Sequence, residues 1–108
     1  MPSKEPSTIT TLFLPPPEKV DIVARTLRGL ANEQRLQILC LLSENNEMSV
    51  GELMQYLDLS QSALSQHLAK LKADNFVSSR KDGLSVFYKV ERQDILEILH
   101  LLHGLYCA

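Results

Sequence analysis

The sequence predicts a mainly α-helical domain that carries a β-hairpin, an α+β fold of the winged helix-turn-helix type. Apolar residues recur at helical spacing in four segments between Glu18 and Ala73. The period then becomes that of extended strands around Asp82-Gly83, a dipeptide typical of hairpin turns, and a last amphipathic helix follows from about Arg92. A short helix, a tight break and a longer helix in the middle of this order are typical of a helix-turn-helix.

The first seventeen residues differ from the rest in composition. All five prolines lie there, around a stretch rich in serine and threonine, and this pattern is typical of a flexible or extended tail. We therefore expect a tail over residues 1–17 and one folded domain over residues 18–108. A chain of 108 residues can bury a single core, but it is small enough that a partner subunit often adds stability.

Capping residues indicate where the helices begin. A first helix carries apolar residues from Val20 to Leu30 at helical spacing, and Asn32 is a good N-cap for a second, over residues 33–43. Ser49 precedes Glu52 by the spacing of a capping box, which opens a short helix through residue 57. Ser60 caps a fourth helix, and the last helix carries these apolar side chains: Ile95, Ile98, Leu99, Leu102, Leu105 and Tyr106.

The composition limits the classes of protein that the chain can belong to. No apolar run approaches the length of a membrane span, and the N-terminus lacks the basic-then-apolar pattern of a signal peptide. The two cysteines lie 67 positions apart, which fits no compact metal-binding spacing. We expect a cytoplasmic protein without a membrane partner or a permanent structural disulfide.

Charge is distributed unevenly along the chain. The net charge is −2, but it divides into −3 over residues 1–59, +3 over residues 60–92 and −2 over residues 93–108. A locally basic segment is what contact with phosphates requires, and a symmetric dimer would present it twice. A solvated charged face explains the same numbers about equally well.

The segment "SQSALSQHLAKLK" is the candidate recognition helix. Leu64, Leu68 and Leu71 form a narrow apolar stripe, so the opposite face consists of small or medium-sized neutral side chains that donate and accept hydrogen bonds: Gln61, Ser62, Ser65 and Gln66. Such side chains suit a helix in the major groove of DNA, and Lys70 and Lys72 suit the phosphate backbone. An ordinary exposed helix face is the alternative, but glutamate and lysine are the usual choice there.

Three segments carry a family resemblance: "LRGLANEQRLQILCLL", "SVGELMQYLDLSQSALSQHLAKLK" and "SRKDGLSVFYKV". Over about residues 20–107 the chain resembles the ArsR/SmtB family of dimeric bacterial transcription regulators. The resemblance implies a homodimer that pairs through its first and last helices and binds double-stranded DNA at an inverted-repeat operator. It also implies the DNA contacts, with Ser60 and the Ser and Gln side chains of the recognition helix on bases or phosphates, and Arg80 and Lys81 of the wing on the flanking backbone or minor groove.

His67 lies within this segment, next to Leu68 and two residues after Ser65. No third orienting group and no oxyanion donor accompany it, so we expect no catalysis and no enzyme. We expect His67 to brace the helix-turn-helix through a hydrogen bond, with a contact to a phosphate as well.

The metal-binding patterns usual in the family are missing. The stretch "SVGELM" has no cysteine pair, and Asp94 is followed by Ile and Leu instead of the expected histidine spacing. The positions of Cys40 and Cys107 instead resemble a subgroup represented by HlyU- and BigR-type regulators. That resemblance implies that the two thiols meet within a protomer, and that persulfides or oxidants bridge them and alter DNA affinity, with no cofactor.

The residues support this dithiol only in part. Cys107 lies about 140° from the centre of the apolar stripe of the last helix, on the side of His100 and His103. Cys40 stands in an apolar run, where a small buried packing residue is the better interpretation for that cysteine alone.

Alternatives therefore remain open. Cys40, His100, His103 and Cys107 together have the composition of a tetrahedral zinc site, which would make the protein zinc-responsive. The thiols could be inert in an activator that competes with a DNA-silencing protein. A winged-helix module that binds another protein instead of DNA is the third alternative, and it predicts no salt-dependent DNA binding.

Overall fold

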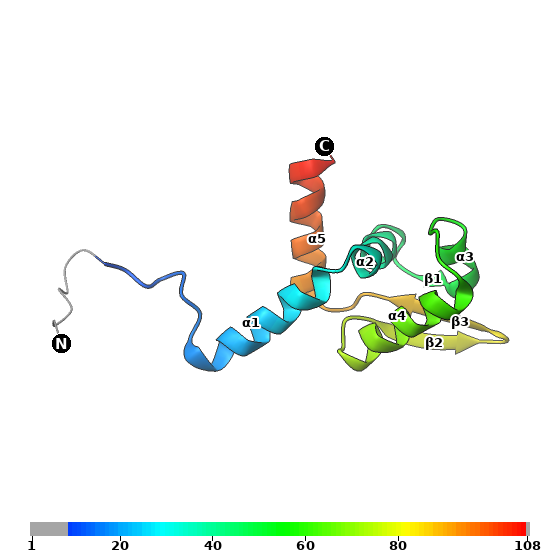
Figure 1. The fold of residues 1–108 in the computed structure, drawn as a ribbon, viewed down its shortest axis with the longest axis horizontal. Helices are drawn as coiled ribbons and strands as arrows, with labels where there is room; N and C mark the ends of the chain where they lie inside the picture. The colour runs from blue at the N-terminus through cyan, green and yellow to red at the C-terminus, as the bar shows by residue number, and fades with distance from the viewer. Residues whose placement is uncertain (1–8, 108) are drawn as a thin grey trace.

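The computed structural model describes residues 9–107, and over these residues it confirms the winged helix-turn-helix prediction (Figure 1). Helices α3 and α4 form the helix-turn-helix, and strands β2 and β3 form the wing. The elements follow in this order: α1 (Pro17–Leu30), α2 (Glu33–Asn45), β1 (Met48–Ser49), α3 (Val50–Met54), α4 (Gln61–Ala73), β2 (Ser78–Asp82), β3 (Ser85–Lys89) and α5 (Gln93–Tyr106).

The predicted caps begin three of the helices. The side chain of Asn32 accepts from the backbone N–H of the residue three positions on at 3.0 Å, and Ser60 does the same at 3.1 Å. Ser49 and Glu52 form both hydrogen bonds of the capping box. Helix α3 ends at Met54, three residues before the expected end, because the next two backbone N–H groups bond to carbonyls three residues back, which tightens the last turn.

The sheet contains one strand that the sequence pattern did not predict. Two-residue β1 pairs antiparallel with β3, so that the strand order is β1-β3-β2. The predicted hairpin is present, but Asp82 pairs with Ser85, so the two loop residues are Gly83 and Leu84. Gly83 has φ 65°, a left-handed conformation that glycine adopts without strain and that a type II′ turn needs at its first loop position.

The core lies between α2, α3, α4 and the first turns of α5. Leu64, Leu68 and Leu71 are each at most 1% exposed, as their spacing predicts. They pack in one cluster with the following fully buried side chains of the other helices: Ile38, Leu39, Leu42, Leu53 and Ile95. Burying this stripe fixes the orientation of α4 and leaves its polar face outside.

Helix α1 extends away from this core, and α5 stands upright beside α2 (Figure 1). Pro17 occupies the first turn of α1, one residue before the expected domain start, where a missing N–H costs nothing. A Cβ atom on Gly29 would lie 2.2 Å from Cζ of Phe76, so α1 can approach the Phe76 ring only because residue 29 is glycine.

Residues 9–16 form no helix or strand, and residues 1–8 of the expected tail lie outside the described residues. No helix between residues 9 and 107 is long and apolar enough to span a bilayer.

Candidate nucleic-acid interface

The outward face of α4 consists of short polar side chains. Gln61, Ser62, Ser65 and Gln66 are all exposed, because the three leucines between them turn the other face of the helix into the core. Ser60 is exposed too, and its hydroxyl oxygen accepts the cap hydrogen bond from Ala63. The structure therefore presents all the predicted readers of α4 on one open surface, with no bulky side chain among them.

His67 joins the recognition helix to α2. Its Nε2 lies 2.8 Å from Oε1 of Gln34, and since an amide oxygen can only accept, the imidazole nitrogen donates. This is the brace that we expected of His67. The partner, 33 residues away, could not be read from the sequence.

The two lysines of α4 differ in their surroundings. Both Lys70 and Lys72 are exposed, but Lys72 donates from Nζ to Oγ of Ser79 at 2.7 Å and so links α4 to strand β2. This contact holds the base of the wing against the recognition helix. It leaves Lys70 as the lysine of α4 without a hydrogen bond or ion pair among residues 9–107.

The wing places Arg80 and Lys81 on opposite faces of the sheet. In the β2–β3 register Arg80 is opposite Phe87 and Lys81 is opposite Val86, and successive side chains of a strand point to opposite sides. Lys81 is exposed near the end of β2. Arg80 lies over the Phe87 ring, with its guanidinium carbon 4.8 Å from the ring centre.

Arg80 is also held by a residue that the sequence analysis did not single out. Its Nε and Nη2 atoms each donate to a carboxylate oxygen of Glu47 at 2.8 Å. Hydrogen bonding to Arg80 lowers the pKa of Glu47, and the same bonds raise the pKa of Arg80. The pair joins the residue before β1 to β2 across 33 positions, a contact without a local sequence signal.

Cys40 and Cys107 are both free thiols and both exposed, which corrects the expectation that Cys40 is a buried packing residue. The buried side chains of α2 are Ile38, Leu39 and Leu42. Cys40 is turned about 100° from Leu39 and about 200° from the other two, so it faces away from the core. The sequence does not show the orientation of Cys40, because the apolar residues around it cover more than one face of the helix.

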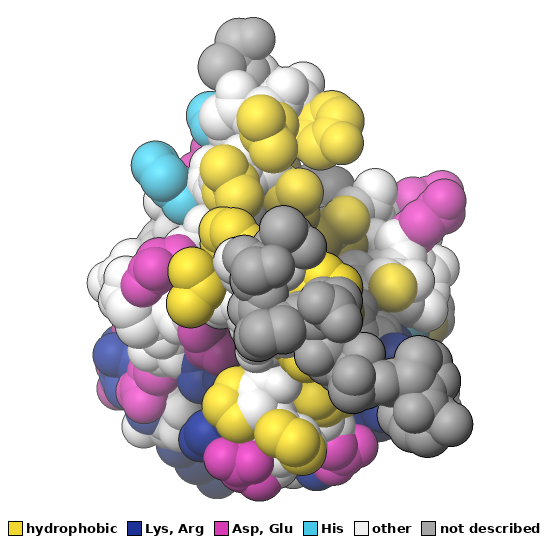
Figure 2. Space-filling model, turned by 90° about the vertical axis from the view of Figure 1, so that its left-hand side faces the viewer, with side chains coloured by type: hydrophobic (Ala, Val, Ile, Leu, Met, Phe, Trp, Pro, Cys, Tyr) yellow, Lys and Arg dark blue, Asp and Glu magenta, His cyan; other side chains and the backbone are white. Residues whose placement is uncertain are grey.

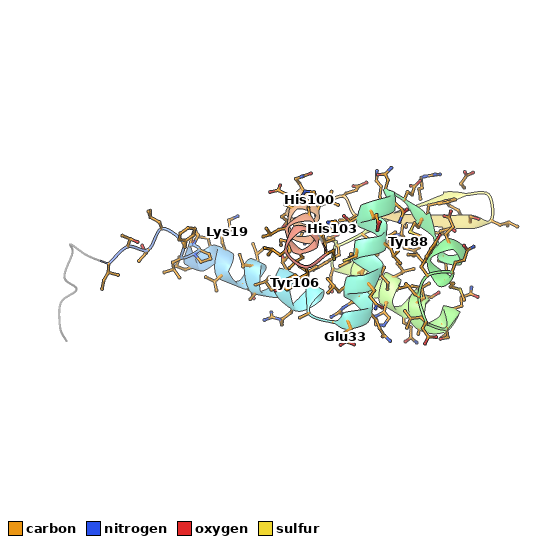
Figure 3. All side chains as sticks on the ribbon, turned by 90° about the horizontal axis from the view of Figure 1, so that it is seen from above. Lys19, Glu33, Tyr88, His100, His103 and Tyr106 are labelled. Carbon is orange, nitrogen blue, oxygen red and sulfur yellow. The ribbon has the colours of Figure 1, made fainter. Side chains whose placement is uncertain are left out.

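The two thiols belong to helices that contact each other, and Cys107 contributes to the pKa of Cys40. The pKa of Cys40 is raised, first by partial burial of the sulfur, then by the negative charge of Cys107 and then by that of Glu44. Figure 3 looks almost along α5 and shows α2 beside it, with His100 and His103 on α5. Cys107 caps the end of α5, where its backbone N–H donates to the carbonyl of His103 at 2.8 Å.

The structure does not assemble the four-ligand zinc alternative. Within residues 9–107 no three or more His, Cys, Asp or Glu side chains gather closely enough to hold a metal ion. His100 and His103 are exposed on α5. The predicted set of Cys40, His100, His103 and Cys107 is therefore not brought together within this protomer.

A second surface, over α1 and α5, is apolar. Figure 2, viewed from the N-terminal end of α1, shows hydrophobic side chains gathered on these helices. Their exposed members are Val20, Ile22, Val23, Leu27, Leu101, Leu105 and Tyr106. No described element of the same chain covers them, and such a patch is typical of a surface that pairs with another protein.

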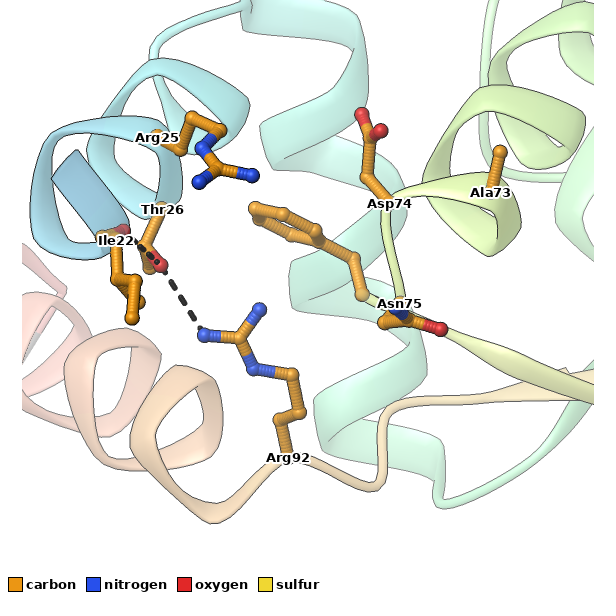
Figure 4. Close-up of a pocket in the computed structure, with 8 residues that line it drawn as sticks. Ile22, Arg25, Thr26, Ala73, Asp74, Asn75 and Arg92 are labelled. Atoms are coloured by element: carbon orange, nitrogen blue, oxygen red, sulfur yellow. Dashed lines mark hydrogen bonds between the residues drawn. The ribbon is translucent and has the colours of Figure 1, made fainter.

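A recess of about 320 Å³ separates this apolar surface from the end of α4 (Figure 4). Nη2 of Arg92 donates to Oγ1 of buried Thr26 on α1 at 3.1 Å, and its guanidinium lies 5.3 Å from the centre of the Phe76 ring. The recess contains none of the predicted site residues. Its contacts join α1, the turn after α4 and the start of α5.

Comparison with known proteins identifies relatives of the chain. The family model of the bacterial regulatory proteins of the arsR family matches residues 32–79. Over 81 residues the chain is 54% identical to the transcriptional activator HlyU of Vibrio cholerae serotype O1, covering 75% of this chain and 74% of that protein. It is 34% identical over 108 residues to the biofilm growth-associated repressor of Agrobacterium fabrum, covering 99% and 92%. The structure of reduced HlyU from Vibrio cholerae superimposes with a TM-score of 0.79 at 48% identity, over 84% of this chain and 95% of that one.

Proposed function

The chain belongs to the arsR family of bacterial regulatory proteins and is a DNA-binding transcriptional regulator, and from that premise we propose that a Cys40/Cys107 dithiol controls its affinity for an inverted-repeat operator. Regulators of this family typically form dimers. The exposed apolar surface over α1 and α5 is the surface through which we propose that this chain pairs.

In the proposed complex the two α4 helices of the dimer enter two successive major grooves of the DNA, one helix in each groove. Gln61 and Gln66 read base edges, since glutamine pairs with adenine through two hydrogen bonds. The flanking phosphates are contacted by Lys70 of α4 and by Arg80 and Lys81 of the wing. The hydroxyl groups of α4 and its cap contact phosphates too, and they belong to Ser60, Ser62 and Ser65. His67 contributes by keeping α4 fixed on α2.

The observation that carries the proposed switch is the position of two exposed thiols, one on α2 and one at the end of α5, the helix that contacts α2. The charge of Cys107 reaches Cys40 across the contact between α2 and α5, and HlyU, to which the chain is similar, has been solved in a reduced form. A bridge between the thiols would tie α5 to α2. Because α5 carries part of the proposed pairing surface, the tie would change the separation of the two α4 helices, which must match major grooves about 34 Å apart.

The pKa of Cys40 suggests an order of events. Because burial raises the pKa of Cys40, its thiolate is disfavoured, and we propose that Cys107 attacks the oxidant first. Cys40 then attacks the sulfenic acid of Cys107, which closes the disulfide and releases water. With hydrogen peroxide, the two thiols lose two electrons and two protons, and the peroxide becomes two molecules of water.

Titration of the protein onto its own upstream DNA tests the proposal. Reduced, peroxide-treated and persulfide-treated samples are compared, together with the variants Cys40→Ser and Cys107→Ser, and the mass of each sample is measured. We expect affinity to fall only in the wild type, with a loss of two hydrogen masses for the bridge. Unchanged affinity despite bridging would reject the switch and favour an activator with inert thiols that competes with a silencing protein.

A further inference from the structure

The outer face of the wing holds an arginine whose best donors are already occupied. Nε and Nη2 of Arg80 form the two-pronged arrangement that binds a carboxylate or a phosphate equally well, and Glu47 takes both prongs at 2.8 Å. The Arg80 side chain is nevertheless 53% exposed, while that of Glu47 is 24% exposed. A phosphate approaching the wing can therefore reach Arg80.

The surroundings of this pair are acidic. Nη1 of Arg80 lies 3.7 Å from the Asp82 carboxylate. Nζ of Lys89 lies 3.6 Å from the Glu91 carboxylate in a second recess, which Glu47 and Arg80 also line. Two cations thus stand among three carboxylates. A phosphate gains little from this face as long as every cation on it is neutralised by its own partner.

We propose that Glu47 competes with a DNA phosphate for Arg80, and that this competition limits the affinity of the wing for DNA of any sequence. The inference rests on the proposed docking of the wing on the DNA backbone. Glu47 acts through Arg80 and does not itself contact DNA, so it is a positioning residue.

The competition has a consequence for the salt dependence of binding. A lysine or arginine that neutralises a phosphate releases a counterion, and each such contact adds about 0.9 to the slope of log affinity against log salt. When Arg80 leaves Glu47 for a phosphate, the freed carboxylate takes up a cation from solution. The net release at Arg80 is then close to zero, so that Arg80 adds little to the slope in the wild type.

The test measures the binding of the reduced, full-length protein to operator and to scrambled duplex between about 50 and 200 mM salt. For Glu47→Gln we expect three- to tenfold tighter binding to both duplexes at the lowest salt, with a slope steeper by about 0.9. Glu91→Gln is the matched comparison, because it removes the same charge from this second recess but frees Lys89 instead of Arg80. The double variant Glu47→Gln/Arg80→Gln should lose the gain.

Three results would overturn the inference. Unchanged or weaker binding of Glu47→Gln would show that Glu47 does not compete with the phosphate. An equal gain in affinity in Glu91→Gln would show that removal of any negative charge from this face has the same effect. Persistence of the gain in the double variant would remove Arg80 from the explanation. Gln66→Ala is measured in parallel, since a loss of operator binding there together with an unchanged Glu47→Gln rejects the inference and leaves the proposed docking intact. The melting temperature of each variant shows whether its fold is affected, and a purely structural role would not change the salt slope.

Discussion

The two open surfaces of the protein are built from opposite kinds of side chain. The surface over α4 and the wing presents short polar groups and cations, and none of the large exposed apolar side chains lies on α4. The surface over α1 and α5 presents leucine, valine, isoleucine and tyrosine, with Leu105 65% exposed and Tyr106 81% exposed. One surface suits phosphates and base edges, and the other suits a protein partner.

In the proposed complex, affinity for DNA depends on both surfaces in different ways. We expect the polar surface to determine which bases and phosphates one protomer contacts. We expect the apolar surface to determine whether two protomers bind as one unit, which would raise the affinity for paired half-sites without any new contact to DNA. Substitutions on the two surfaces should therefore have distinguishable effects.

The largest effect should come from charging the apolar surface. In Leu101→Glu/Leu105→Glu we expect a protomer-sized mass and a loss of operator affinity of about 100-fold or more, because two linked half-sites become two independent ones. Light scattering and operator titration measure both. Leu84→Glu, at a still more exposed leucine on the wing tip, should keep the dimer mass. A double variant that remains dimeric would show that α5 is not part of the pairing surface.

The next effect concerns base reading on the polar surface. Gln66→Ala should weaken operator binding about tenfold, since one two-pronged contact to a base contributes about 1–3 kcal/mol of discrimination. Binding to scrambled DNA and the salt slope should stay unchanged. Titration of both duplexes checks this prediction. Gln37→Ala is the matched control, because Gln37 is an exposed glutamine on α2. Equal weakening on both duplexes would place Gln66 on the backbone.

A smaller effect is expected from Lys81, which forms no ion pair within residues 9–107. Lys81→Ala should weaken binding to operator and scrambled DNA alike by about threefold, and reduce the salt slope by about 0.9, the contribution of one phosphate. Fluorescence anisotropy across a salt series measures this slope. If only operator binding weakens, Lys81 contacts a base in the minor groove instead.

The smallest effect should appear in the acid stability of the apolar side. The hydrogen bond from Arg92 lowers the pKa of Asp94, at the start of α5. The folded protein therefore binds a proton at Asp94 less readily than the unfolded chain does. The pair stabilises the folded state at pH values above the ordinary pKa of aspartate, and this stabilisation is lost as the pH falls below about 4. Melting temperatures from pH 7 to 3 should fall less steeply in Asp94→Asn. Parallel curves would mean that the pair contributes no stability.

Local signals were sufficient to predict most of the fold. Asn32, Ser49 with Glu52, and Ser60 each act within three or four residues, so the helix starts could be read directly from the sequence. The same holds for the leucine stripe of α4 and for the hairpin around Gly83. These features depend only on the spacing of apolar residues along the chain and on the chemistry of neighbouring residues.

The features that the sequence did not predict depend on distant partners or on the choice between helix faces. Strand β1 has two residues and exists because β3 pairs with it some forty positions later. The partners of His67 and Arg80 are each 33 residues away. The sequence pattern places Cys40 in the core because several faces of α2 are apolar, and only the packed structure shows which of these faces is buried.

Beside the recess that Phe76 lines, Gly29 of α1 lies directly against the Phe76 ring, with no room for a side chain between them. Phe76 follows α4 by three residues and fills the space that any side chain at position 29 would need. Close-packed contacts of this kind transmit displacement instead of absorbing it. If α1 pairs with a partner subunit as proposed, we expect a tilt of α1 to displace the end of α4 through the contact between Gly29 and Phe76. Pairing on one side of the molecule would then change the angle at which α4 meets DNA on the other side.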